Sequence, residues 1–348
     1  WNLEEAADLL MDEFSRQNLQ KQLMDSRKAS QPKVETYRLS SILSNTHQYF
    51  NLLFDLLELG NPSVNSLIWN LLNKIPVNQY MFENIKKLNI VNQEDWDRLL
   101  DSSCMYKLPY SLQIVNSFVS GSESNSSPEE VEERQAWRTK FLELGGFEHL
   151  YNILMSAKLS QNSQDCTAKC IGLLLGVLKL FIQATLLNQP CEQLQSIFTP
   201  FISSESMTLE FPNLIRQMSE DAGKKVMEVI HFPAFISKLL EIVEISINIS
   251  SLESVQSSLD LLLPMIVFKP ELLPDLYNRS NFNNLIASTL LTCSCSEVRE
   301  SIKATFGIVA ESVEELPESI QLPKHFFLET LLAKLPTGQN PYCHEFFE

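Results

Sequence analysis

Cysteine and histidine offer this chain its widest range of chemistry, because a paired thiolate and imidazole can act as nucleophile and base. The sequence contains seven Cys and five His. A nucleophilic Cys needs a lowered pKa and an exposed turn, and no Cys here stands in a Gly-flanked turn. Cys343 and His344 are neighbours, so on a helix their side chains would point about 100° apart. We therefore expect no catalytic residue in this chain.

Closely spaced cysteines also suggest metal binding. Cys166 and Cys170 are four residues apart and would share a helix face, and Cys293 and Cys295 are separated by one residue. A zinc site needs four ligands, usually two closely spaced pairs, and neither pair has a suitable second pair or a His nearby. The sequence favours buried free thiols over a metal site or a redox pair.

Glycine is scarce, at 9 residues in 348. Nucleotide sites need Gly-rich loops, and Gly172 and Gly176 instead lie inside an apolar helical run, where small residues allow close packing. Gly145-Gly146 precedes a helix whose free N–H groups could hold an anion, although a tight turn between helices is the favoured interpretation. Paired carboxylates such as Glu129-Glu130 lie in solvated runs without apolar walls to raise a pKa. We expect no cofactor.

The charge balance limits the partners. Lys and Arg number 27 against 43 Asp and Glu, giving a net charge of −16 and a pI near 4.8. Nucleic acids and anionic membrane surfaces require clustered Lys and Arg, which the chain lacks. This balance suits neutral or basic protein partners. An odd number of scattered Cys and no secretory leader predict the reducing cytosol, or the nucleus.

The longest apolar run covers residues 171–187 and is interrupted by Lys179 and Gln183. It falls short of the roughly 20 apolar residues that a membrane-spanning helix needs. We expect a buried helix.

The elements that would position any site are helices, because apolar residues recur at i, i+3 and i+4 along most of the chain. Prolines fall mostly between these stripes, and Gly60-Asn61-Pro62 predicts a helix stop followed by a new start. The three clearest N-terminal stripes are Leu3, Ala6, Ala7, Leu10, Met11 and Phe14; Tyr49, Leu52, Leu53, Leu56 and Leu57; and Leu67, Ile68, Leu71, Leu72 and Ile75.

One stretch is ambiguous. Val243, Ile245, Ile247 and Ile249 alternate with polar residues, which indicates a strand. Val243 and Ile247 also continue a helical stripe from Leu239, and an isolated strand would have no partner. We favour a helix.

Residues 120–133 interrupt the helical pattern with one apolar residue and five acids. The start of this segment cannot bury enough surface to become ordered. Its second half is suited to open a helix, because Ser127 can cap and Pro128 fits the first helical position. A solvated loop is the favoured interpretation; a phosphorylated loop or a docking strip for a basic partner are the alternatives.

Four polar breaks are each followed by an apolar helical stripe: residues 60–64, 161–165, 250–255 and 293–299. Val255 and Val298 occupy corresponding positions 43 residues apart, within the ~40–47-residue period of armadillo and HEAT units. Stacked helical hairpins bury a face that one hairpin cannot hide alone. We predict an all-α, armadillo/HEAT-like α-solenoid of stacked hairpins; a helical bundle is the alternative.

Three segments resemble lines from the long non-catalytic flanks of giant ubiquitin-specific proteases. The first runs from Trp137 through Phe141-Leu142, Gly145-Gly146-Phe147 and Leu150-Tyr151 to Leu154. The second is Ile68-Trp69-Asn70-Leu71-Leu72 with Pro76 and Asn78. The third is Leu331-Leu332, Leu335-Pro336, Cys343 and Phe346-Phe347.

The resemblance implies a parent that is a cysteine-type deubiquitinase. The Gly-Asn-Thr-Cys-type and Gly-His-Tyr-type boxes of such enzymes do not occur here, so no catalytic residue is carried over. This segment would be a scaffold that binds ubiquitinated substrate, an adaptor or the parent's own catalytic domain. The alternative is a HEAT/armadillo adaptor or transport factor unrelated to ubiquitin; a free-standing helical enzyme is the third hypothesis.

We divide the chain into N-terminal helical repeats (1–119), an acidic Ser-rich loop (120–133) and C-terminal armadillo-like repeats (134–348), forming one continuous array. Aromatic side chains often anchor protein interfaces. The candidates are Trp96, Tyr110, Trp137 and Tyr342, each more consistent with a core position than with a contact.

Overall fold

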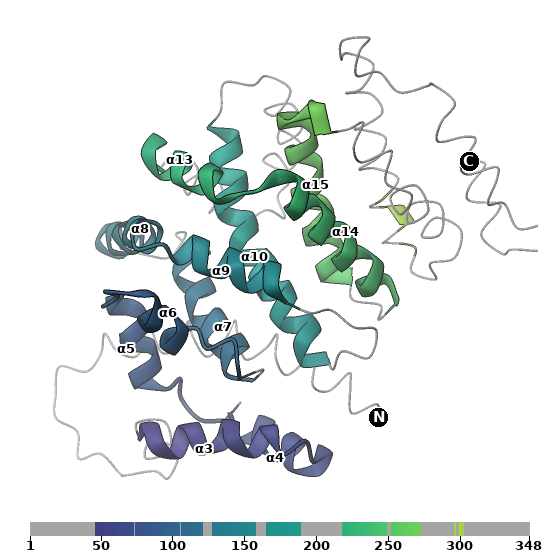
Figure 1. Cartoon of the computed structure of the whole chain (residues 1–348). Coiled ribbons are helices and arrows are strands. Elements are labelled where there is room, and N and C mark those ends of the chain that lie inside the picture. Colours follow the sequence, from purple (N-terminus) through teal and green to yellow (C-terminus); the bar gives the residue numbers. More distant parts are fainter. Residues whose placement is uncertain are drawn as a thin grey trace, which may run out of the picture. The chain divides into compact units, whose positions relative to one another are not determined.

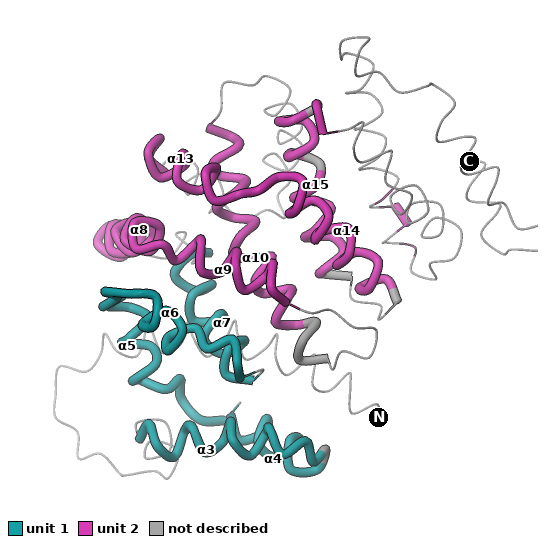
Figure 2. The backbone as a smooth tube through the Cα atoms, in the orientation of Figure 1, with its two compact units in different colours: residues 1–121 teal, residues 122–348 magenta. Residues whose placement is uncertain are grey.

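The computed structural model describes residues 46–72, 74–104, 106–120, 127–157, 165–188, 218–248 and 252–272, with four further positions at 296, 299, 300 and 302. Within these residues the protein is all-α, with eleven α-helices, one short 3-10 helix and no strand (Figure 1). The chain divides into two compact units, residues 1–121 and residues 122–348 (Figure 2). The predicted helix over residues 3–14 lies outside the described residues.

Unit 1 contains the helices α3 to α7. α3 packs against α4, and α5 packs against both α6 and α7 (Figure 1). Its core includes an aromatic cluster in which the ring of Tyr110 lies 5.3 Å from that of Phe50 and 5.7 Å from that of Phe54. The five helices are α3 (His47–Glu58), α4 (Pro62–Leu72), α5 (Gln79–Lys87), α6 (Gln93–Leu99) and α7 (Lys107–Val119).

The break predicted at Gly60-Asn61-Pro62 is confirmed. Gly60 has a φ of +68°, a left-handed conformation that glycine adopts without steric cost, and it follows the last turn of α3. The Asn61 side chain then accepts hydrogen bonds from the backbone N–H groups of Ser63 and Val64 at the start of α4. Local chemistry therefore sets this turn.

The apolar stripe predicted on α3 is only partly correct. Leu53 and Leu57 are buried together with Phe50 and Phe54, but Tyr49 and Leu52 are exposed. On α4, Ile68 and Leu72 are buried as expected, and Leu67 is exposed. Each of these helices carries more apolar residues than the face that packs inside unit 1 can cover.

Unit 2 is built around the long helix α10, which packs against α9, α13 and α15, while α15 also packs against α14. Within the described residues, one stretch of α10, Lys169–Leu187, is long and apolar enough by composition to cross a membrane. Most of it, 72% of its most apolar window, is buried inside the protein, as in a core helix. The elements are α8 (Pro128–Glu143), α9 (Gly146–Ser156), α10 (Asp165–Leu187), α13 (Glu220–Val229), α14 (Phe232–Asn248), α15 (Leu252–Phe268) and the 3-10 helix η1 (Pro270–Leu272).

Polar contacts join distant helices of unit 2. The Lys179 ammonium on α10 lies 3.0 Å from the Asp260 carboxylate on α15. The buried Lys238 amine on α14 donates to the carbonyl oxygen of Ala157, the residue that ends α9. The last carbonyls of a helix lack intrahelical partners, and the Lys238 amine provides a donor to one of them. Its positive charge also interacts favourably with the negative end of the α9 dipole.

The ambiguous stretch 243–249 is helical as far as it is described, since α14 extends to Asn248. Ile242 and Val243 on this helix are buried, and α14 packs against α15. Ile249 lies outside the described residues.

Within the segment 120–133, the helix start predicted at Ser127-Pro128 is confirmed, so the acidic loop ends before Pro128 rather than at residue 133. Pro128 begins α8, so residues 128–133 are helical. Ser127 accepts a hydrogen bond from the backbone N–H of Glu130, and the Glu130 carboxylate accepts one from the N–H of Ser127, which forms a capping box. Residues 121–126 lie outside the described part of the chain.

Candidate functional site

A groove that a ligand could enter lies in unit 1 and has a volume of about 690 Å³. It is formed by α5, the following turn and α6, together with the starts of α3 and α7. Apolar, aromatic, amide and charged side chains all line it. The lining residues are His47, Tyr80, Met81, Asn84, Ile85, Asn89, Ile90, Glu94, Asp95, Asp97, Arg98, Leu99, Asp101 and Lys107.

Capping interactions hold α6 in place at the groove. The Asn92 side chain accepts a hydrogen bond from the N–H of Asp95, 3.1 Å long. The Asp95 carboxylate in return accepts from the N–H groups of Val91 and Asn92, at 3.0 and 3.2 Å. These two backbone donors lower the pKa of Asp95 below its usual value. Asp95 therefore carries a stable negative charge at the groove while it fixes the start of α6.

Acidic residues outnumber basic ones in the lining. The Arg98 guanidinium lies 3.5 Å from Glu94 and 3.6 Å from Asp95, and the Lys107 ammonium lies 3.7 Å from Asp101. With Asp97, four carboxylates face two cations, so the groove has an excess of two negative charges. Such a surface attracts cationic side chains.

His47 is a neutral aromatic surface in this groove. Burial, and then the positive charge of Lys107, lower the pKa of His47. Its Nε2 atom lies 3.0 Å from the side-chain amide nitrogen of Asn51, one helical turn further along α3. The imidazole ring packs against the phenol ring of Tyr80, with the ring centres 4.2 Å apart. Tyr80 remains half-exposed and can contact a ligand.

The floor of the groove is apolar. Met81 and Ile85 on α5 are buried in the core of unit 1. The amides of Asn84 and Asn89 add hydrogen-bond donors and acceptors. The lining contains no thiol and no hydroxyl except the Tyr80 phenol. The groove therefore combines a small apolar floor with a lining that is otherwise polar and charged.

The aromatic candidates from the sequence do not contribute to this groove. Trp96, Tyr110 and Trp137 are all buried, which is the core position that the sequence favoured, and we do not carry them forward as partner contacts. Trp137 stacks on Phe141, with ring centres 5.1 Å apart. Tyr342 lies outside the described residues.

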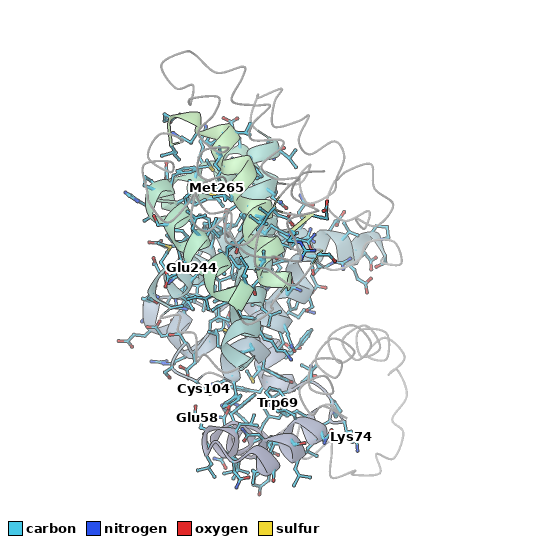
Figure 3. The ribbon with its side chains drawn as sticks, turned by 90° about the vertical axis from the view of Figure 1, so that its right-hand side faces the viewer. Glu58, Trp69, Lys74, Cys104, Glu244 and Met265 are labelled. Carbon is cyan, nitrogen blue, oxygen red and sulfur yellow. The ribbon has the colours of Figure 1, made fainter. Side chains whose placement is uncertain are left out.

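The cysteines that the structure describes lie in positions that are typical of packing rather than of catalysis. Cys170 is buried on α10, and Cys104 is partly buried before α7. Burial, and then a hydrogen bond to Glu58, raise the pKa of Cys104, which opposes nucleophilic activation. The Glu58 and Cys104 side chains lie near each other in unit 1 (Figure 3). Within the described residues, no cluster of three or more His, Cys, Asp or Glu side chains is suited to hold a metal ion. The pairs Cys293/Cys295 and Cys343/His344 lie outside the described residues.

Gly145-Gly146 makes a tight turn that begins α9. Gly145 has a φ of +80°, and a Cβ atom on Gly146 would come within 2.5 Å of the Phe141 ring. Gly145 is therefore favoured by its backbone conformation, and Gly146 by the close approach of the Phe141 ring on α8.

Sequence reasoning did not find the groove residues. His47, Tyr80, Arg98 and Lys107 come from four different helices or helix starts, and no short motif joins them. The one local signal was the run Asn92 to Asp95, whose Asn and acidic residues mark a helix start.

Comparison with known proteins gives no assignment: no protein-family model, no curated protein and no solved structure matches this chain.

Proposed function

We propose that this chain is a non-catalytic helical scaffold that binds protein partners, and that the unit 1 groove receives an extended partner segment. The observation that carries the proposal is the combination of an apolar floor, the half-exposed Tyr80 ring and an acidic rim in one groove. Neutral amides at Asn84 and Asn89 can pair with the backbone of a bound peptide. Contacts of these kinds suit an extended peptide that binds at several points, rather than a substrate that reacts at one catalytic centre.

The favoured partner segment carries basic and apolar side chains. Glu94 and Asp97 lie at the exposed edge of α6 and can attract Lys or Arg, while the floor accepts apolar side chains. The net charge of −16 over the whole chain favours encounter with basic partners.

The broader architecture that we propose is an armadillo/HEAT-like solenoid. Its support is the packing of helices that follow one another in sequence, such as α3 with α4 and α14 with α15, which is how hairpin repeats stack. The resemblance of three sequence segments to the flanks of giant ubiquitin-specific proteases supports a parent deubiquitinase in the cytoplasm or nucleus. An adaptor or transport factor unrelated to ubiquitin would use the same groove.

The groove is tested with the whole chain and a short fluorescein-labelled peptide of alternating Lys and Leu. Fluorescence anisotropy should show binding that weakens with salt, and a Glu/Leu peptide should not bind. Replacing Glu94→Gln and Asp97→Asn together should weaken binding roughly three- to tenfold. Glu132→Gln, an exposed acid on α8, is the matched control. If the Glu94→Gln/Asp97→Asn variant bound the Lys/Leu peptide as tightly as the wild-type chain and the Glu132→Gln control do, the groove would be rejected as the binding site.

The ubiquitin connection is tested separately with a ubiquitin-based electrophilic probe. We expect covalent reaction with an intact parent protein and none with this chain. If neither reacts, the adaptor function becomes the leading hypothesis, whereas reaction with this chain alone would overturn its non-catalytic role.

A further inference from the structure

Helix α3 has an exposed apolar stripe in addition to its buried face. Tyr49, Leu52 and Leu59 are 53%, 51% and 71% exposed, and Leu59 continues the helix with αR backbone angles. With a helical repeat of 3.6 residues, these three residues and the partly exposed Leu56 fall on one side. The opposite side, with Phe50 and Phe54, packs into unit 1.

We define the exposed stripe as Tyr49, Leu52, Leu56 and Leu59. Such a stripe is unusual on the solvent-facing side of a helix. A surface helix normally places apolar residues on one face and polar residues on the other, and a helix that is apolar on two faces is usually covered on both. The described residues leave the stripe uncovered, since three of its members remain more than half exposed.

We propose that the stripe is the docking surface of the chain's own N-terminal segment, residues 3–14. This segment lies outside the described residues, but its sequence has the pattern of an amphipathic helix and the chain connects it to α3. Its apolar residues recur at helical spacing, so a helix would present them on one face. They are Leu3, Ala6, Ala7, Leu10, Met11 and Phe14.

The charges of the segment are compatible with this docking. Its acids, Glu4, Glu5, Asp8, Asp12 and Glu13, fall between the apolar positions and so occupy the other side of a helix. That side would face solvent when the apolar side meets the stripe. Two helices joined in this way make an antiparallel or crossed pair packed through side chains, the common mode of helix association.

The covalent connection favours this occupant over a second copy of the chain. The segment leads into α3 at Thr46, the N-cap residue, so it is tethered beside the stripe. Residues 15–45 can span about 100 Å when extended, and α3 is only about 18 Å long, so the segment can reach every part of the stripe. A tether of this length gives an effective concentration on the order of millimolar near α3. A second copy must instead overcome the repulsion of two chains that each carry a net charge of −16.

The test is hydrogen exchange by mass spectrometry on the full 348-residue chain. In the wild-type protein, amides of residues 3–14 should exchange more slowly than in an unstructured peptide of the same sequence. The double substitution Leu52→Gln/Leu59→Gln should speed their exchange about 10- to 100-fold, because each Leu loses its apolar contact. Val91→Gln is the matched control, since Val91 is 92% exposed elsewhere in unit 1 and its change should leave the exchange unaltered.

A reciprocal variant and a mass measurement make the outcome decisive. Leu10→Gln/Phe14→Gln should speed exchange in the segment to the same degree. Circular dichroism should show that α3 variants remain folded, because the substituted side chains are exposed. Unchanged exchange in Leu52→Gln/Leu59→Gln would overturn the proposal. Light scattering that shows a dimer, dissociated by this variant without any change in segment exchange, would assign the stripe to a second copy instead.

Discussion

The phenolic oxygen of Tyr110 accepts a 2.9 Å hydrogen bond from the backbone N–H of Asn78, 32 residues earlier in the chain. Both residues are buried, and Asn78 also caps α5 through its side chain, which accepts from the N–H of Met81. The contact therefore links the start of α5 to α7. Both helices line the groove, α5 with several side chains and α7 with Lys107.

Replacing Tyr110→Phe should destabilise unit 1 by about 1–3 kcal/mol, because the substitution leaves the buried Asn78 N–H without this acceptor. Urea unfolding followed by circular dichroism measures the change. Tyr80→Phe is the control, because the Tyr80 ring is half-exposed and should tolerate the loss of its hydroxyl. Equal stability of Tyr110→Phe and the wild-type protein would show that water replaces the lost oxygen.

The same tyrosine predicts a loss of stability in alkali. Burial raises the pKa of Tyr110 well above its usual value, against the smaller opposite effect of the Asn78 N–H. The unfolded chain releases this proton near pH 10, while the folded chain retains it, so the unfolded state binds fewer protons above that pH. The contribution is fully present below about pH 10 and is lost as the pH rises toward the folded pKa. The unfolding free energy of Tyr110→Phe should fall less steeply over this range, and parallel slopes would contradict the prediction.

The Lys179–Asp260 ion pair should stabilise the packing of α10 against α15. Both side chains are about four-fifths buried and their charged atoms lie 3.0 Å apart. Lys179→Met leaves the carboxylate without this partner and should cost about 1–3 kcal/mol, between the values for exposed and fully buried pairs. Thermal unfolding provides the measurement. The control is Lys224→Met, whose partner Glu220 is exposed, and which should have no measurable effect.

Gly146→Ala should destabilise the junction of α8 and α9. The new methyl group would come 2.5 Å from the Phe141 ring. That ring cannot move aside easily, because it stacks between Trp137 and Phe181, with ring centres 5.1 and 5.8 Å away. Overpacking of this kind costs about 1–3 kcal/mol, which chemical denaturation can resolve.

Two other glycines separate overpacking from backbone effects. Gly145→Ala has space for its methyl group but a φ of +80°, so it should cost about 1–2 kcal/mol through backbone strain alone. Gly176→Ala lies within α10 with no atom within 4 Å, and should stabilise the protein by about 0.5–1 kcal/mol. If all three substitutions had the same effect, the Phe141 contact would not be the cause at Gly146.

Cys104 should react slowly with alkylating reagents. Burial raises the pKa of its thiol, and the hydrogen bond to Glu58 raises it further. Glu58→Gln removes the negative charge, so the pKa should fall and more thiolate should be present around pH 8. Site-resolved mass spectrometry of iodoacetamide labelling should then show faster modification of Cys104. Asp55→Asn, on the same helix, is the control, and equal rates in all three proteins would contradict the role of Glu58.

Local sequence patterns were sufficient to predict that the protein is all-helical and where several helices begin or end. Gly60-Asn61-Pro62, Ser127-Pro128 and Gly145-Gly146 each mark a helix end or start through chemistry confined to a few residues, and the structure confirms them. The helix across 243–248 also followed from periodicity, once an isolated strand was judged unfavourable.

The tertiary structure decided which apolar faces are covered. Leu52 and Leu53 look alike in sequence, yet Leu53 packs into unit 1 and Leu52 remains exposed, because only one side of α3 meets a described helix. Periodicity locates a stripe but carries no information about the neighbour that covers it. The groove has the same origin, since Tyr80 and Lys107 become neighbours only when α5 and α7 pack together.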